Sequence, residues 1–295
     1  MARTLARDLI DYDPRLFLEP PGEPAVTAPG SVTWQVFGNP VVLAVGGIAA
    51  VLLELGEPRV RAGVWDHSSF RDDPRGRIRR TGLGALVTAF AAESRFAAYA
   101  ERVNGIHAQV QGRTPEGEPY RADQSELLRW VQATAAFCFV ESYVALIRPL
   151  SPAETNRFYA EAAVGARYYQ VADAPASQAE MARYLAGMRS ALSPSLVIGE
   201  FLEIMRRGAV LPAALRSLQP VLVRAAVERV PAPFREQLGI AAEPVPSAAE
   251  RRALRLAAWM AERVRLPDDP RELAACRVRT RPPSGSLAGA ARPRS

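Results

Sequence analysis

The chain has 295 residues, of which 48% are hydrophobic and 23% charged, so it can bury a sizeable core as one large domain or two small ones. Its net charge of +6 rests on 37 basic residues, all of them arginine, which excludes a Schiff-base lysine and a P-loop lysine. The arginines are spread along the chain rather than gathered with aromatic residues into one stripe, so we expect no nucleic-acid partner.

The two cysteines and two histidines limit the chemistry further. Cys138 and Cys276 form neither a CxxC nor a CxxCH motif, which favours a reducing, cytoplasmic compartment and excludes covalent haem attachment by the usual motif. His67 and His107 are too few for a three-histidine zinc site. One histidine is nevertheless enough to ligate a haem iron.

The N-terminal part of the chain predicts an extended arm followed by a core helix. Residues 1–30 are rich in proline, and acidic Asp8 and Asp11 stand where a basic leader would be, so we expect no signal peptide. The apolar run 41–53 is shorter than the roughly 20 residues of a membrane-spanning helix. We interpret it as a buried core helix and expect no transmembrane span; a segment lying on a membrane surface is the alternative.

The rest of the chain indicates helices. Capping-box patterns, in which a Ser or Asp precedes a Glu by three positions, predict four helix starts. They are Asp123 with Glu126, Ser151 with Glu154, Ser177 with Glu180, and Ser247 with Glu250. Apolar periodicity predicts helices over about 40–55, 57–67, 82–92, 94–111, 123–147, 151–169, 177–191, 195–207, 213–229 and 248–264.

No alternating strand pattern bounded by turns is present, and the segment 113–120 is a loop by its Pro and Gly content. We therefore predict an all-α fold: a single globular multi-helix domain over 31–265, between the N-terminal arm and a basic tail over 266–295. The end of that tail lacks an apolar period, so we expect it to be disordered.

The helix predicted over 94–111 carries a histidine beside an apolar stripe. The stripe consists of Phe96, Tyr99, Val103, Ile106 and Val110. His107 borders it and should point toward the interior. A partly buried neutral imidazole needs a hydrogen bond or a metal, and from these residues alone a hydrogen-bonded core histidine is the simpler interpretation.

Several motifs occur in a characteristic order. Residues 65–81 read WDHSSFRDDPRGRIRRT, 102–112 read RVNGIHAQVQG, and 120–134 read YRADQSELLRWVQAT. Further along, 149–165 read PLSPAETNRFYAEAAVG and 231–239 read PAPFREQLG. Over roughly 34–240, this order and spacing resembles the latex-clearing (rubber) oxygenase and MpaB-type oxygenase family.

The resemblance implies an all-α oxidoreductase that holds a non-covalent haem b and acts with dioxygen on an apolar substrate, such as an isoprenoid or lipid. His107 occupies the position of the proximal iron ligand. Arg77 and Thr81 match further site residues, and Arg80 stands where rubber oxygenases carry lysine. We therefore expect Arg77, Arg80 and Thr81 to be catalytic, and Arg77 and Thr81 also to contact the cofactor. Without the resemblance, the stretch 75–80 would be a solvated basic loop.

The chain departs from the family at two motifs. A Gln-x-x-His-Pro element is replaced by a stretch from Glu54 to Glu57 and Pro58, and the histidine of a WVHAT element is replaced by Gln132. His107 is thus the main ligand candidate, with His67 as the alternative. Glu57 is either a pocket carboxylate or an exposed glutamate at a helix start.

The role of Cys138 and the class of protein each have alternative interpretations. Cys138 lies between two phenylalanines, which favours an inert buried thiol over an iron ligand. The alternatives to an oxygenase are a non-catalytic helical protein that binds an apolar ligand in the same cavity and, third, a peripheral membrane protein anchored through 40–56.

Overall fold

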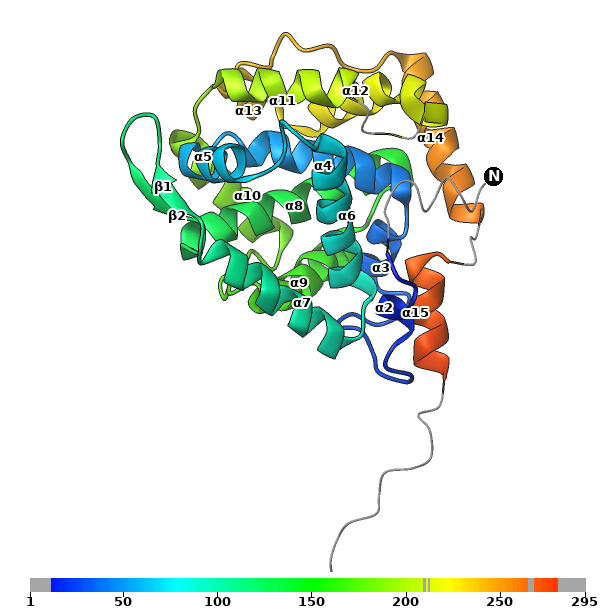
Figure 1. Ribbon diagram of the computed structural model, residues 1–295. Helices are drawn as coiled ribbons and strands as arrows, with labels where there is room; N and C mark the ends of the chain where they lie inside the picture. The colour runs from blue at the N-terminus through cyan, green and yellow to red at the C-terminus, as the bar shows by residue number, and fades with distance from the viewer. Residues whose placement is uncertain (1–11, 209–210, 212, 265–267, 281–295) are drawn as a thin grey trace, which may run out of the picture.

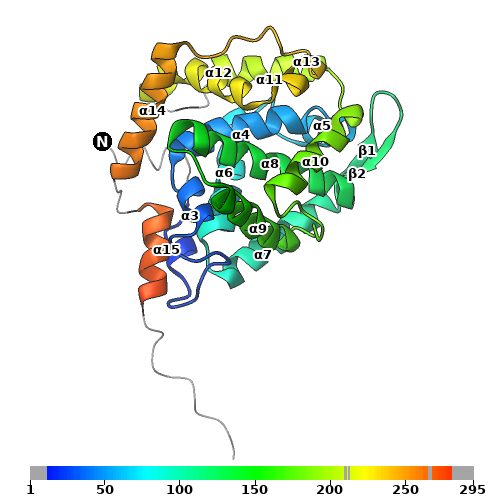
Figure 2. The same cartoon turned by 180° about the vertical axis from the view of Figure 1, so that it is seen from behind.

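The computed structural model describes residues 12–208, 211, 213–264 and 268–280, and the fold is all-α over these residues (Figures 1 and 2). The α-helices are α2 (Arg15–Leu18), α3 (Val32–Phe37), α4 (Pro40–Glu54), α5 (Pro58–His67), α6 (Pro74–Phe90), α7 (Glu93–His107), α8 (Ser125–Leu146), α9 (Pro152–Tyr168), α10 (Gln178–Met188), α11 (Leu196–Arg207), α12 (Gln219–Arg229), α13 (Ala232–Gln237), α14 (Ala248–Arg263) and α15 (Pro270–Arg279). Short 3-10 turns, η1 (Arg189–Ala191) and η2 (Ala213–Leu218), precede α11 and α12.

Helices α4 and α8 form the centre of the molecule, with α11 and α12 on one side and α7 and α9 on the other (Figure 1). The two central helices can approach closely because Gly46 of α4 faces α8: a Cβ atom there would lie 2.6 Å from Cδ1 of Phe139. Asn39 caps α4 by accepting hydrogen bonds from the amides of Val41 and Val42. The core therefore forms around a helix pair joined through a small residue.

The apolar run 41–53 lies within α4, and the prediction of a core helix is confirmed. Val42, Val45 and Leu52 are at most 1% exposed. These side chains contact protein, which argues against the membrane-surface alternative for this segment. Among the described helices, none is by itself long and apolar enough to cross a membrane; α4 and α5 would satisfy that criterion only as a pair, across a bend of 114°.

The segment 75–80 differs from the loop that its charge suggested. Helix α6 begins at Pro74, about two turns before the predicted start at 82, because Pro74 occupies the first turn and Asp73 accepts a hydrogen bond from the amide of Gly76 at 2.8 Å. Arg77 and Thr81 are therefore separated by one helical turn.

A short antiparallel hairpin interrupts the helices. Strand β1 (Gln111–Arg113) pairs with β2 (Pro119–Arg121), with Gly112 opposite Tyr120. Helix α7 ends at His107, four residues earlier than predicted, and the loop predicted over 113–120 connects and overlaps the two strands.

The four capping boxes have different outcomes. Ser151 and Ser247 form complete boxes with Glu154 and Glu250. Ser177 accepts a hydrogen bond from the amide of Glu180, but that carboxylate binds the amide of Ala176 instead of closing the box. The prediction at Asp123 is wrong: its carboxylate pairs with Arg121 at 2.6 Å, and α8 begins at Ser125 without a side-chain cap.

Both ends of the described chain are attached to the helical body. Phe17 in α2 is completely buried, and α15 packs against α2 and α6. The guanidinium of Arg277, a residue 1% exposed, donates to the carbonyls of Phe17, Glu23 and Phe90 at 2.7–3.0 Å. The segment after 266 thus contains a docked helix that its weak apolar pattern did not predict. The expectation for residues beyond 280 lies outside the described residues, and the division into arm, domain and tail stays a prediction.

Candidate functional site

Arg77 on α6 is the centre of a group of ionisable side chains from different helices. Burial lowers the pKa of its guanidinium, and the carboxylate of Glu54 at the end of α4 opposes that effect. Tyr99 on α7 also raises the pKa of Arg77. The positive charge of Arg77 in turn lowers the pKa of His107 at the end of α7. The tertiary structure therefore brings α4, α6 and α7 together at Arg77.

Thr81 supports the position of Arg77. Its hydroxyl oxygen accepts a hydrogen bond from Nη1 of Arg77 at 3.3 Å and donates to the backbone carbonyl of Arg77 at 3.0 Å. The Nε atom of Arg77 is buried and has no hydrogen-bond partner within the described chain. A buried guanidinium donor without an acceptor is suited to an acidic group on a bound molecule.

Glu54 is the acidic member of the group. Burial raises the pKa of its carboxyl to about 7, against the opposing effects of the Arg77 charge and a hydrogen bond with Thr134 on α8. A carboxyl with such a pKa can hold or release a proton near neutral pH.

One face of α4 next to Glu54 borders open space. Leu43, Gly47, Val51 and Glu54 follow one another at helical spacing and are all partly accessible, although most of α4 is buried. Apart from the neighbouring residues and backbone of α4 itself, no atom lies within 4 Å of a Cβ built on Gly47. This mostly apolar face leads to the ionisable group at Glu54.

His107 is the last residue of α7 and is partly buried. Burial and the charge of Arg77 lower its pKa, while Asp123 opposes them, so the imidazole is neutral near pH 7. Its Nδ1 atom is buried and has no hydrogen-bond partner among the described residues. Ile106, predicted on the same apolar stripe, is 61% exposed.

Arg80 was predicted to belong to the site, but its side chain contacts Ser69 and Asp73. Its side chain is 58% exposed; its guanidinium donates to Oγ of Ser69 at 2.6 Å and lies 3.7 Å from the carboxylate of Asp73. It thus contacts the segment between α5 and α6, and no contact joins it to His107. Its predicted catalytic role gains no support from this geometry.

His67 is the alternative iron ligand, and the structure disfavours it. It ends α5 and is exposed, and its Nε2 lies 3.1 Å from the hydroxyl of Tyr120. Both observations place His67 at a helix end on the surface, away from the group at Arg77. His107 consequently remains the main ligand candidate.

Glu57 and Cys138 have structural roles. Glu57 caps the start of α5, as one of the two alternatives predicted. It is only 2% exposed, so the prediction that it is exposed is wrong. Its carboxylate accepts hydrogen bonds from the amide of Val60 and from Nε of Arg59, both at 2.7 Å. Burial raises the pKa of the Cys138 thiol well above its usual value, which agrees with an inert thiol.

Sequence reasoning missed three members of the group. Glu54 was noted only as a departure from the family motif, Tyr99 only as part of an apolar stripe, and Thr134 not as a site residue. A usable signal existed for Glu54, since it is the only ionisable residue within the apolar helix α4. Its partners could not be deduced, because they lie on other helices.

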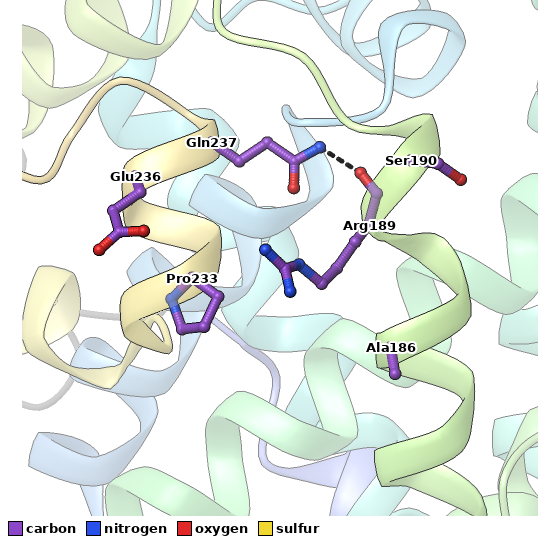
Figure 3. A pocket seen from close by; sticks show the side chains of 6 residues that line it. All are labelled: Ala186, Arg189, Ser190, Pro233, Glu236 and Gln237. Carbon is purple, nitrogen blue, oxygen red and sulfur yellow. Dashed lines mark hydrogen bonds between the residues drawn. The ribbon is translucent and has the colours of Figure 1, made fainter.

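A recess lies on the surface between α10 and α13 (Figure 3). It is lined by Ala186, Arg189, Ser190, Pro233, Glu236 and Gln237. The amide nitrogen of Gln237 donates to the carbonyl of Arg189 across it. The recess contains none of the predicted site residues and is separate from the group at Arg77.

Comparison with protein families agrees with the motifs. The family described as "ER-bound oxygenase mpaB/B'/Rubber oxygenase, catalytic domain" matches residues 34–263, and the chain therefore belongs to this family of oxygenase catalytic domains. It is accordingly an enzyme of the oxidoreductase class. Neither curated proteins nor solved structures gave a match to the chain.

Proposed function

We propose that the chain is a haem-dependent oxygenase that holds a non-covalent haem b through His107 and acts with dioxygen on an apolar substrate, such as an isoprenoid or lipid. The observation that carries the proposal is the state of His107: it is partly buried, its pKa is lowered, and its Nδ1 has no partner. A neutral imidazole with an unsatisfied ring nitrogen is the form that a metal binds.

The surrounding residues fit such a cofactor. Among the described residues, no three His, Cys, Asp or Glu side chains are grouped to hold a bare metal ion, whereas a haem iron needs a single protein ligand. Arg77 offers an unpartnered buried donor, which suits a propionate. The apolar face of α4 with Leu43, Gly47 and Val51 supplies a surface for an apolar molecule.

Each residue has a distinct role in this proposal. When bound, the haem iron supplies the binding and activation of dioxygen. Arg77 pairs with an acidic group of the bound molecule and is held in position by Thr81. Glu54 holds a proton on its carboxyl oxygen or accepts one near neutral pH. The apolar face of α4 excludes water from the space that the substrate occupies.

The second candidate is a non-catalytic protein that binds an apolar ligand. The open face of α4 favours it as much as it favours an oxygenase, because an apolar surface beside open space suits either role. The two candidates differ in what they require of His107, and this difference can be measured.

The test is haem loading of the full chain expressed with ample haem. We expect a Soret band at one haem per chain, its loss in His107→Ala with unchanged helical circular dichroism, and its retention in the control His67→Ala. Retention in His107→Ala together with loss in His67→Ala would reverse the assignment. If the wild type binds no haem under any loading condition, the haem-dependent reading fails, and uptake of an apolar fluorescent probe then tests the second candidate.

A further inference from the structure

The outer face of α14 exposes a cluster of large apolar side chains. Leu256, Trp259, Met260 and the following Val264 are 46–56% exposed. The three other tryptophans of the chain, by contrast, are at most 5% exposed. A contiguous row of this kind on a structured helix marks an interaction surface more often than isolated exposed residues do.

The inner face fixes which way this row points. Leu254 and Ala258 are buried against the bundle, and the carbonyl of Ala258 accepts a hydrogen bond from Nδ2 of Asn39 at 2.9 Å. Arg251 pairs with Glu228 on α12 at 2.5 Å. Because α14 is held on its inner side and lies at the edge of the molecule (Figures 1 and 2), the row faces away from the helices that α14 packs against.

The charge of the same face is positive. Arg252, Arg255 and Arg263 are exposed beside the apolar row, and the guanidinium carbon of Arg263 lies 3.7 Å from the ring centroid of Trp259. The two acidic residues of α14, Glu250 and Glu262, are not among its exposed residues. The outer face therefore combines apolar side chains with arginine only.

We propose that this face of α14 binds an anionic lipid surface, with Leu256, Met260 and Val264 inserted at the boundary between headgroups and acyl chains. An interfacial helix has this combination of an apolar row, a tryptophan and flanking basic residues. The arginines contact lipid phosphates, to which the net charge of +6 also attracts the chain. The proposal does not depend on haem or on the proposed reaction.

The charge pattern favours lipid over a second copy of the chain. A symmetric dimer through α14 would place its arginines near those of the other copy, because a two-fold interface pairs each patch with itself. Like charges so placed repel each other. An anionic membrane meets the apolar and the basic residues of the face at once.

The test is cosedimentation of the full chain with vesicles of phosphatidylcholine alone and with about one third phosphatidylglycerol. We expect binding to the anionic vesicles, weakened by high salt, and a blue shift of the Trp259 emission against the constant emission of the buried tryptophans. The triple variant Leu256→Ser, Met260→Ser, Val264→Ser should bind at least about tenfold more weakly. The pair Arg252→Glu, Arg263→Glu should lose the preference for anionic lipid.

Matched control variants come from α11. Leu196 is 95% exposed and the side chain of Arg207 is 82% exposed, so Leu196→Ser and Arg207→Glu make the same changes elsewhere on the surface and should bind as the wild type does. The proposal is overturned if no vesicle binds, if the α14 variants bind as tightly as the wild type, or if the controls weaken binding equally. A dimer that the triple variant dissociates, without vesicle binding, would show an interface between copies instead.

Discussion

At the scale of single residues, the structure shows which ionisable groups surround Arg77. The sequence order indicated that Arg77, Thr81 and His107 belong to one site, and the structure places a guanidinium where it affects the titration of both Glu54 and His107. The helix that separates Arg77 and Thr81 by one turn was not predicted, because the expected helix began only at residue 82. The proximity of Glu54 could not be predicted either, because it depends on how α4 and α6 cross.

Replacing Glu54 by glutamine should change the pH dependence of stability. The carboxyl pKa is raised from 4.5 to about 7 in the folded chain, so the folded state binds the proton more tightly than the unfolded state. The wild type should therefore lose up to about 3 kcal/mol of unfolding free energy as the pH rises from about 4.5 through 7. Glu54→Gln cannot ionise and should lack this loss.

The measurement is urea unfolding of the wild type and Glu54→Gln at pH 5 and pH 8. The stability of the variant relative to the wild type should increase between the two pH values. Glu118→Gln is the control, since the side chain of Glu118 is 56% exposed and should show almost no change. An equal difference at both pH values would mean that Glu54 is not the group responsible.

At the scale of elements, helix starts and helix contacts differ in predictability. A capping box is local, so Ser151 and Ser247 could be recognised from four consecutive residues. Asp123 fits the same pattern, yet the neighbouring Arg121 competes for its carboxylate through a charged hydrogen bond. The start of α6 was missed because its first two turns carry arginines instead of an apolar period.

The adjacent glycines of α4 make a matched pair for testing the α4–α8 contact. Gly46→Ala should destabilise the fold by roughly 1–3 kcal/mol, because its Cβ would lie 2.6 Å from Cδ1 and 3.0 Å from Cα of Phe139. Gly47→Ala should stabilise it by roughly 0.5–1 kcal/mol, because open space lies beside Gly47 and alanine favours the helix. Thermal unfolding of both variants without added haem measures the difference. Equal effects of the two substitutions would contradict the packing described for α4 and α8.

At the scale of the whole molecule, the two ends of the described chain are joined through Arg277. Its carbonyl partners, Phe17, Glu23 and Phe90, lie 187–260 positions earlier in the sequence. No carboxylate pairs with its guanidinium at salt-bridge distance among the described residues, and burial lowers its pKa. Its Nε and Nη1 donate to these carbonyls, while Nη2 is buried without a partner in the described chain. Removing the guanidinium is costly because it leaves the carbonyls without donors.

Truncation and substitution separate α15 from the residues after it. A chain ending at Thr280 should melt close to the wild-type temperature, since the residues beyond it have no apolar period. A chain ending at Asp268, or Arg277→Ala in the full chain, should lose several kcal/mol of stability through three unsatisfied carbonyls. Arg279→Ala, in the same helix and exposed, is the control. A large loss from the shorter truncation at Thr280 would show that later residues also contribute.

The amino-acid sequence by itself determined the all-α class, most helix positions and the family; its choice of His107 as the ligand candidate stays a prediction. Periodicity and capping residues are local and lie within a few turns of chain, and the order of motifs over roughly 34–240 can be read directly along the sequence. The position of Glu54 beside Arg77, the unpartnered Nδ1 of His107 and the attachment of α15 by Arg277 were decided only by the tertiary structure. Each depends on the burial of a polar group by helices that are distant in sequence, and local patterns do not contain the packing that causes such burial.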